Sequence, residues 1–358
     1  MRLTQHLIRR LPKTDIHCHL DGCLRPRTVL ALAEAQGVKL PTRNLARLTR
    51  LLEAGRRTRN LGDYLKIFDI TLSVLQQREA LYRAAYELAE DAAAENVRHL
   101  EVRYSPILHR RRRLSFEDIV DPVVQGLADA GRHHHISTGV IICGIRSMNP
   151  KVSIALAELA VAYKGRGVLA FDLAGQEKDY PAKAHRAAFE VILKNNVNST
   201  VHAGEAFGPQ SIAQALHYCG AHRIGHGTRL REDADLMRYV NDHRIPLEMC
   251  LSSNVQTRAV RSIREHPFHE YFRQGLRVTL NTDSRLVSAT SVSREIGLAA
   301  RAFHLNAYEI KRIIIMGFKS SFLPYAQKAR TLREVNLEID RIFMEEFPQE
   351  YDRRATGL

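Results

Sequence analysis

Two histidines near the start of the chain, His17 and His19 in the segment DIHCHLDG, carry side chains that commonly bind metal ions. The segment has the character of a short β-strand, in which successive side chains point to opposite faces. His17 and His19 therefore share one face, and Cys18 between them points to the other. Two ligands do not complete a metal site, so the pattern predicts further ligands elsewhere in the chain.

Metal-binding and acid–base side chains also end three later β-rich runs, STVHAGE, RIGHGT and RVTLNTDS. These ends supply His202, Glu205, His226 and Asp283. Imidazole and carboxylate groups are ligands that Zn²⁺ takes, and a catalytic zinc keeps one position open for water. A lone histidine beside glycines is more often structural, but the joint occurrence of these residues at successive strand ends favours a functional site.

The types of these residues predict a hydrolytic metal site. The predicted ligands of a Zn²⁺ ion are His17, His19, His202 and Asp283. Such an ion lowers the pKa of a bound water toward about 7 and so supplies hydroxide at neutral pH. Glu205 and His226 would remain nearby as acid–base groups. Because Glu205 must carry a proton to act as an acid near neutral pH, we expect its pKa to be raised.

Eight short β-rich runs position these residues, and helical stretches separate many of them. The runs cover 13–21, 97–106, 137–146, 167–177, 199–205, 223–228, 245–254 and 277–284. Eight strand–helix units in a chain of 358 residues predict an α/β fold, one (β/α)₈ TIM barrel over residues 1–358. Active sites of such barrels lie at the carboxyl ends of the strands, where the polar residues named above are expected to meet.

Two parts of the chain fall outside the simple strand–helix repeat. The segment of roughly 22–96 predicts a helical insertion after the first strand. Within it, LGDYLKIFDITLSVL (61–75) has the pattern of an amphipathic helix near the barrel mouth. The segment after about residue 305 predicts helices on the outside of the barrel.

Seven segments resemble, in order, motifs of the adenosine/AMP deaminase branch of the amidohydrolase superfamily. They are KTDIHCHLDGCLRPRTVLALA, LEVRYSP, FDLAGQE, VHAGE, RIGHGT, LEMCLSSNVQT and LNTDS. The resemblance implies a hydrolase that replaces the C6 amino group of a purine nucleoside, with adenosine or 2′-deoxyadenosine as the expected substrate. It also implies one Zn²⁺ per chain on the four ligands named above, with Asp283 counted among the catalytic residues as well.

The resemblance further implies roles for residues around the substrate. Glu205 would protonate N1 of the purine, and His226 would hold the attacking water and assist its deprotonation. Gly175 would offer its backbone to N3, and Asp21 would lie near the ribose. Three residues match an apolar lid over the purine, although a stripe of helix core explains them equally well: Tyr64, Leu65 and Phe68.

One position departs from the family pattern. The family has Asn-Thr-Asp-Asp at the last strand, and its second aspartate contacts purine N7, whereas this chain has Ser284 followed by Arg285. A serine hydroxyl can donate to N7, but it is shorter and uncharged. Arg285 is expected at the surface beside a carboxylate. The alternative is that it reaches an anionic group of the substrate, as aminodeoxyfutalosine or an AMP-type nucleotide would require.

The composition bounds the other classes of function. A net charge of +14 and arginine-rich stretches at 43–60 and 109–114 would suit nucleic acid, but no recognition motif accompanies them. We therefore expect a solvated basic surface, and a non-catalytic nucleoside- or nucleic-acid-binding barrel remains a remote alternative. Five cysteines without a CxxC pair, no membrane-length apolar run and no signal peptide predict a cytoplasmic protein without a membrane partner. The sequence gives no oligomeric state.

Overall fold

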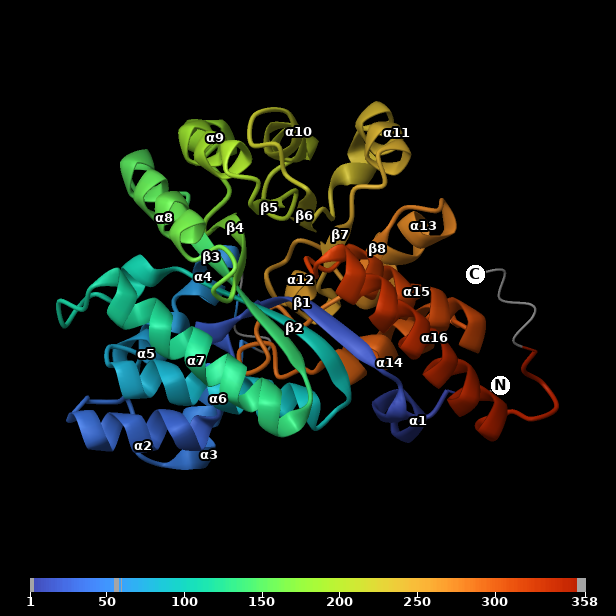
Figure 1. Ribbon diagram of the computed structural model, residues 1–358, viewed down its shortest axis with the longest axis horizontal. Coiled ribbons are helices and arrows are strands. Elements are labelled where there is room, and N and C mark those ends of the chain that lie inside the picture. Colours follow the sequence, from blue (N-terminus) through green and yellow to red (C-terminus); the bar gives the residue numbers. More distant parts are fainter. Residues whose placement is uncertain (1–2, 55–57, 59, 353–358) are drawn as a thin grey trace.

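The computed structural model describes residues 3–54, 58 and 60–352. Eight parallel strands pair in chain order and form a barrel surrounded by helices (Figure 1). The strands are β1 (Lys13–His19), β2 (Val97–Tyr104), β3 (Ser137–Ile145), β4 (Val168–Ala174), β5 (Asn198–Ala203), β6 (Arg223–His226), β7 (Leu247–Met249) and β8 (Val278–Leu280). The predicted (β/α)₈ barrel is confirmed. Each strand is shorter than the run that predicted it, because the polar residues at the run ends belong to the loops.

The barrel closes between β1 and β8 through the backbone of Asp283. The Asp283 amide donates to the His17 carbonyl at 2.8 Å, and the His19 amide donates to the Asp283 carbonyl at 2.7 Å. These bonds form a single parallel bridge between Cys18 and Asp283. Three of the predicted metal ligands are therefore held in register by the hydrogen bonds that complete the barrel.

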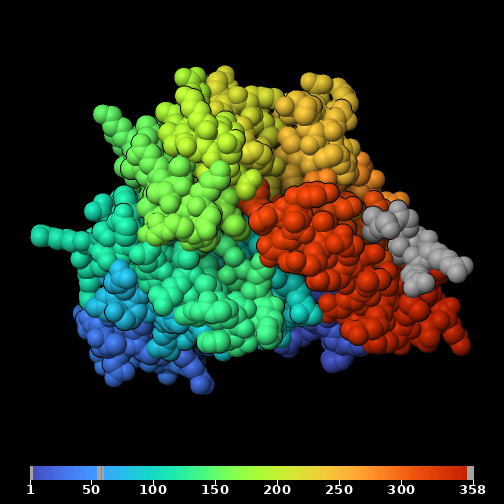
Figure 2. Space-filling view, in the orientation of Figure 1, coloured from blue at the N-terminus to red at the C-terminus, as the bar shows by residue number. Residues whose placement is uncertain are grey.

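Helices surround the strands in the order that the sequence predicts. They are α1 (Gln5–Arg10), α7 (Phe116–His134), α8 (Pro150–Ala162), α9 (Arg186–Lys194), α10 (Pro209–His217), α11 (Ala234–Asp242), α12 (Leu251–Gln256), α13 (Phe268–Arg273) and α14 (Val292–Phe303). The expected C-terminal helices are α15 (Ala307–Ser320), which packs against β1 and β8, and α16 (Tyr325–Glu346). Figure 2 shows these two helices, in red, on the outside of the molecule. Among the described residues, no helix is long and apolar enough to cross a membrane.

The segment between β1 and β2 forms the predicted helical insertion. Its helices are α2 (Pro26–Gln36), α3 (Leu45–Leu52), α4 (Leu61–Leu65), α5 (Phe68–Val74) and α6 (Arg78–Ala93). The run 61–75 contains two helices, α4 and α5, where we predicted one. The Ile67 amide bonds the carbonyl of Tyr64, three residues back, and this tighter turn interrupts the α-helical pattern.

Helices α4 and α5 pack over the barrel mouth. Their side chains Tyr64, Phe68 and Leu72 form a small hydrophobic cluster with Ala54 and Val287. Val287 belongs to the loop after β8, so the insertion is attached to the same loop that carries Asp283. The predicted position of the insertion near the barrel mouth is therefore confirmed.

Candidate active site

A cavity of about 260 Å³ lies at the carboxyl ends of the strands. Ten of the twelve predicted site residues line it: His19, Asp21, Tyr64, Leu65, Phe68, Gly175, His202, Glu205, His226 and Asp283. His17 and Ser284 do not line it, and both are fully buried. Residues that are up to 264 positions apart, from His19 to Asp283, thus meet where the fold predicts an active site.

Histidine and aspartate side chains surround one point at the floor of this cavity. Ligand atoms of His17, His202, His226 and Asp283 all lie within 4.8 Å of one another, and all four residues are buried. His19 is adjacent, with its Nε2 3.1 Å from His202 Nε2 and 3.4 Å from Asp283 Oδ1. Five side chains therefore approach a site for which the sequence predicts four ligands. The four residues whose ligand atoms lie closest together include His226, whereas the predicted set of four ligands includes His19 instead.

The donor atoms fit a bound metal ion. Ligands about 2.1 Å from a tetrahedral ion lie about 3.4 Å from one another. The two contacts of His19 have nearly this spacing, and His17 Nε2 lies 3.5 Å from Asp283 Oδ1. Burial lowers the pKa of His17 to about 4, and its Nε2 is a buried atom without a hydrogen-bond partner among the described residues. A neutral, unpartnered nitrogen facing a carboxylate oxygen is the arrangement that a cation between them would satisfy.

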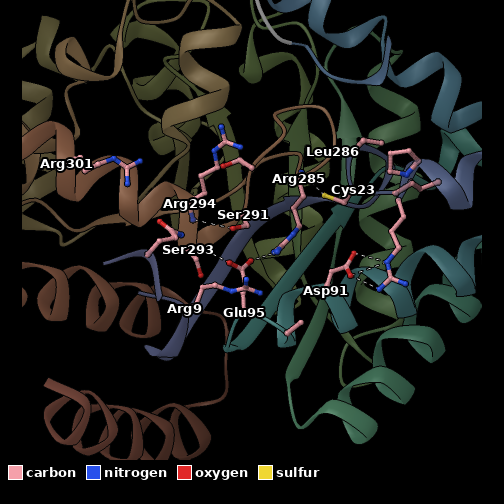
Figure 3. Close-up of a pocket in the computed structure, with 16 residues that line it drawn as sticks. Arg9, Cys23, Asp91, Glu95, Arg285, Leu286, Ser291, Ser293, Arg294 and Arg301 are labelled. Carbon is pink, nitrogen blue, oxygen red and sulfur yellow. Dashed lines mark hydrogen bonds and ion pairs between the residues drawn. The ribbon is translucent and has the colours of Figure 1, made fainter. Parts of the chain in front are cut away.

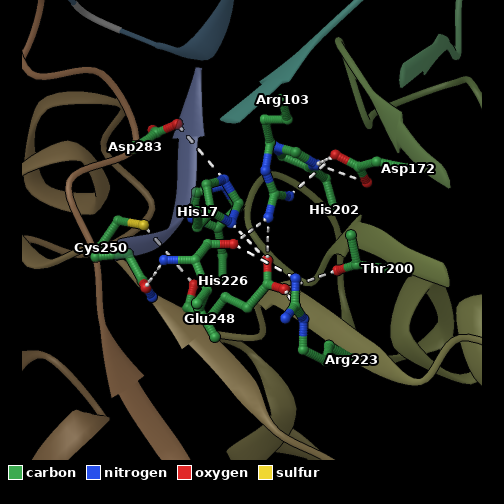
Figure 4. Close-up of polar contacts among 12 residues, drawn as sticks. His17, Arg103, Asp172, Thr200, His202, Arg223, His226, Glu248, Cys250 and Asp283 are labelled. Atoms are coloured by element: carbon green, nitrogen blue, oxygen red, sulfur yellow. Dashed lines mark hydrogen bonds and ion pairs between the residues drawn. The ribbon is translucent and has the colours of Figure 1, made fainter. Parts of the chain in front are cut away.

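Two carboxylates hold the far side of the histidine rings. His17 Nδ1 lies 2.8 Å from Glu248 Oε2, and His202 Nδ1 lies 3.0 Å from Asp172 Oδ2. A carboxylate only accepts hydrogen bonds, so each Nδ1 carries the proton and each Nε2 presents its lone pair to the metal site. Figure 4 shows both pairs, with Arg103 between the two carboxylates.

These carboxylates belong to a layer of buried charges that the sequence analysis did not assign. Arg103 pairs with Asp172 at 3.0 Å and Glu248 at 2.8 Å, and Arg223 pairs with Glu248 at 2.5 Å and Glu101 at 2.6 Å. Burial by itself raises the pKa of Glu248, but Arg103 and Arg223 outweigh it and hold that pKa well below the usual range. The available signal was the alternation of His99, Glu101 and Arg103 with apolar residues along β2, which places these polar side chains on one face of the strand.

We expect Glu248→Gln to weaken metal binding by about 10- to 100-fold, because an amide holds the His17 Nδ1 proton less strongly than a carboxylate does. Competition with a chelator of known affinity measures the change. Thr200→Val is the matched control, since it removes only the 3.0 Å hydroxyl contact to Glu248 Oε1. Unchanged affinity in folded Glu248→Gln protein, with folding checked by circular dichroism, would contradict the expectation.

Glu205 lies beside the metal group with the properties of an acid. Its Oε1 accepts hydrogen bonds from Thr257 Oγ1 at 2.9 Å and Asn254 Nδ2 at 3.2 Å. Its Oε2 is 3.7 Å from His226 Nε2. Burial is the largest cause that raises the pKa of Glu205, as the sequence analysis expected. A carboxyl group of this kind carries a proton closer to neutral pH and can donate it to a substrate.

The hydrogen bonds of Asn254 define the proton position on His226. The Asn254 carbonyl oxygen accepts from His266 Nε2 at 3.1 Å, so its amide nitrogen faces His226 Nδ1 at 3.0 Å. The amide nitrogen only donates, and His226 Nδ1 therefore accepts. In neutral His226 the proton then lies on Nε2, which faces the Glu205 carboxyl. This tautomer has no lone pair on Nε2 for a metal ion, in contrast to His17 and His202.

Three of the predicted substrate-binding residues, Asp21, Gly175 and Ser284, lie in different surroundings. Asp21 lies in a short 3₁₀ helix after β1, where burial raises its pKa to about 7 and its Oδ1 has no hydrogen-bond partner among the described residues. Gly175 follows β4 with a φ of 95°, a conformation that favours glycine. Ser284 is separated from the cavity, and its Oγ lies so close to Gly22 that a side chain at that glycine would collide with it.

Arg285 lies behind the site, in a separate cavity on the outside of the barrel (Figure 3). Its guanidinium pairs with Glu95 and lies 3.7 Å from Asp15 Oδ2. The predicted carboxylate partner is confirmed, but the predicted surface position is wrong, because the side chain is only 10% exposed between these two buried acids. Arg285 is also absent from the wall of the catalytic cavity. Among the described residues that line that cavity, none is lysine or arginine.

An eight-stranded barrel with a buried histidine–aspartate group at its strand ends defines a metal-dependent hydrolase of the amidohydrolase superfamily. Residues 12–338 match the adenosine deaminase family, and the chain belongs to that family.

Similar proteins extend over nearly the whole chain. The adenosine deaminase of Mycobacterium ulcerans is 41% identical over 349 residues, which cover 93% of this chain and 96% of that protein. The adenosine deaminase of Mycobacterium tuberculosis H37Rv is 42% identical over 348 residues, with coverage of 93% and 95%. A probable adenosine deaminase of Dictyostelium discoideum is 38% identical over 341 residues; the match covers 95% of this chain but only 44% of that longer protein.

Solved structures share the fold. The adenine deaminase of Arthrobacter aurescens superposes with a TM-score of 0.86 at 27% identity, covering 91% of this chain and 98% of that one. The N6-methyl-AMP deaminase of Arabidopsis thaliana gives a TM-score of 0.82 at 27% identity, with coverage of 93% and 98%. Relatives on this barrel thus act on purine bases and on nucleotides, so the fold alone does not select the substrate.

Proposed function

We propose that the chain is a zinc-dependent adenosine deaminase that converts adenosine and 2′-deoxyadenosine to inosine and 2′-deoxyinosine with release of ammonia. The observation that carries this proposal is the placement of Glu205, with its raised pKa, beside the histidine–aspartate group in one cavity. The mycobacterial relatives, at 41% and 42% identity over nearly their full length, support adenosine as the substrate.

The proposed zinc ligands are His17, His19, His202 and Asp283, with one ion per chain. The proton on His226 Nε2 supports this set, because a protonated ring nitrogen cannot bind a metal ion. His17 and His202 have their protons on the opposite nitrogen, where Glu248 and Asp172 accept them. In this proposal His226 contacts the reacting groups and does not bind the ion.

The mechanism follows from the positions of these groups. A Zn²⁺ ion held by His17, His19, His202 and Asp283 would lower the pKa of a water molecule and so supply hydroxide at neutral pH. His226 donates a hydrogen bond from Nε2 to the attacking oxygen and orients it toward C6 of the purine; in this tautomer it holds the water and does not deprotonate it. Glu205 gives its proton to N1 as C6 is attacked, which prevents negative charge from building up on the ring. The C6 amino group then takes the proton of the newly added hydroxyl group and leaves as ammonia, while the C6 carbonyl of inosine forms.

The remaining contacts fit an uncharged nucleoside. The Asp21 carboxylate, with its unpartnered buried oxygen, accepts a hydrogen bond from a ribose hydroxyl. The Gly175 backbone approaches N3, where a side chain would crowd the ring. The apolar residues Tyr64, Leu65 and Phe68 cover the base. No described lysine or arginine lines the cavity to pair with a phosphate or carboxylate, which supports adenosine over an AMP-type nucleotide or aminodeoxyfutalosine.

A steady-state comparison of four substrates tests the proposal. Adenosine and 2′-deoxyadenosine are expected to give the highest kcat/KM, followed by AMP and aminodeoxyfutalosine. Turnover of only one of the two anionic compounds would replace the nucleoside proposal with the anionic-substrate alternative. No turnover of any of them, together with salt-dependent binding of RNA, would favour a non-catalytic barrel.

The rate should fall on the alkaline side of the pH profile. Glu205 acts in its protonated form, and its pKa is raised mainly by burial. As the pH rises through this raised pKa, the carboxyl group loses its proton and kcat decreases; below it, the proton is retained. Measurement of kcat for adenosine between about pH 5 and 9 checks this, and Glu205→Gln, which does not titrate, should lack this decrease. A decrease of equal size in Glu205→Gln would assign it to another group.

The domain organisation and the location of the protein are also proposed. We propose that residues 1–358 form one domain, in keeping with the family match over residues 12–338. A cytoplasmic location is supported by the five cysteines, which are all free and buried.

A further inference from the structure

The phenol of Tyr64 is a buried polar group in the wall of the catalytic cavity. Tyr64 is 2% exposed, and its hydroxyl lies 2.9 Å from Ser288 Oγ. Burial is the largest cause that raises the pKa of this phenol well above its usual value. The group therefore stays protonated across the physiological range and keeps a hydrogen to donate.

The hydroxyl of Tyr64, a residue that lines the cavity, can donate a hydrogen bond as well as accept one. In the contact between the Tyr64 hydroxyl and Ser288 Oγ either oxygen can be the donor, so the serine can supply its own hydrogen to the phenol oxygen. The hydroxyl groups of Ser253 and Ser284 also act on the phenol and lower its pKa, although burial outweighs them. With its acceptor position filled by serine, the phenol can act as a donor toward a substrate.

Tyr64 and Glu205 line the same cavity but are held by different loops. Tyr64 bonds Ser288 in the loop after β8, whereas Glu205 follows β5. In an eight-stranded barrel in chain order, β8 and β5 are three strands apart and nearly face each other. In a purine, N1 and N7 flank C6 on its two sides. A base with N1 at Glu205 therefore presents its N7 edge toward the loop after β8.

We propose that the hydroxyl of Tyr64 donates a hydrogen bond to N7 of the purine and so selects bases with a nitrogen at that position. Ser284, the residue expected from the sequence to make this contact, is outside the cavity wall, and its Oγ packs against Gly22. Tyr64 lines the cavity beside Asp283. This inference rests on the proposed deamination of a purine nucleoside, since N7 is defined only for that class of substrate.

The test compares adenosine with 7-deazaadenosine, in which a C–H group replaces N7, in the wild-type protein and in Tyr64→Phe. The substitution removes one oxygen and keeps the ring of the lid. We expect kcat/KM for adenosine to fall by about 10-fold or more while that for 7-deazaadenosine changes little, so that the preference for adenosine shrinks by the same factor. The difference in intrinsic reactivity between the two compounds is common to both proteins and cancels in this ratio.

Tyr104→Phe is the matched control and should retain the wild-type preference, because the hydroxyl of this cavity-lining residue donates to the Ile119 carbonyl at 3.4 Å. An unchanged preference in Tyr64→Phe would overturn the inference, and a loss confined to Ser284→Ala would return the N7 contact to the serine. A wrong proposed function would give a different result, because the wild-type protein itself would then not deaminate adenosine.

Discussion

Replacement of Glu205 by glutamine is expected to lower kcat for adenosine by about 10²- to 10⁴-fold while zinc stays bound. Glutamine keeps the size of the side chain and can still contact Thr257 and Asn254, but it has no acidic proton to give to N1. Attack at C6 then leaves negative charge on the ring. The loss should appear in kcat, because the proton moves during the chemical step and not during binding.

The measurement is single-turnover conversion of adenosine, followed by the change in ultraviolet absorbance, with zinc content determined on the same sample. Glu190→Gln is the matched control, since that carboxylate is exposed on α9 and, among the described residues, pairs only with Arg186, also on the surface. A Glu205→Gln protein that retains zinc and the full rate would remove Glu205 from the mechanism.

His19→Ala and His226→Ala are expected to fail in different ways. We expect His19→Ala to purify without zinc, because it removes a proposed ligand. His226→Ala should keep zinc and lose about 10²- to 10³-fold in kcat, because it removes one donor aimed at the reacting oxygen. Elemental analysis of both purified proteins, together with kcat for adenosine, separates the two roles.

The two variants decide between two sets of four ligands that share His17, His202 and Asp283. Loss of zinc from His226→Ala but not from His19→Ala would assign the ion to the tighter group that contains His226. His133→Ala, at the end of α7, controls for the loss of a histidine outside the site. Chelation of the wild-type protein should abolish activity, and added Zn²⁺ should restore it.

Much of this site follows from local patterns in the sequence. The alternation of side chains along β1 puts His17 and His19 on one face, and the fold brings the strand ends together, which is why His202, Glu205, His226 and Asp283 meet. These inferences need only the period of a strand and the order of the elements. For the same reason the eight strands could be predicted in order, although the predicted runs extend beyond the observed carboxyl ends of β7 and β8 by five and four residues.

Features that depend on long-range packing could not be predicted. The pairing of His17 with Glu248 and of His202 with Asp172 requires knowing which inward-facing charges reach each other across the barrel. The backbone of Asp283 has a φ of 61°, a left-handed conformation that a non-glycine residue adopts only where its surroundings impose it.

The prediction that Ser284 contacts the substrate does not match its position in the structure, for a related reason. Its place in the sequence next to Asp283 suggested a common role, but the left-handed turn at Asp283 directs the following residue away from the cavity and against Gly22. Arg285 is then carried into the buried pair with Glu95 and Asp15.

The hydrogen bonds of Asp283 to His17 and His19 would give a bound metal ion a role in the integrity of the fold. Three of the four proposed ligands, His17, His19 and Asp283, form the seam of the barrel, so an ion bound there would connect the first and last strands across a separation of 266 residues, from 17 to 283. The first and last strands must meet before the full ligand set exists, and an ion that binds only the closed barrel stabilises closure by mass action. With the proposed ligands, metal occupancy would report that folding has been completed, as well as readiness for catalysis.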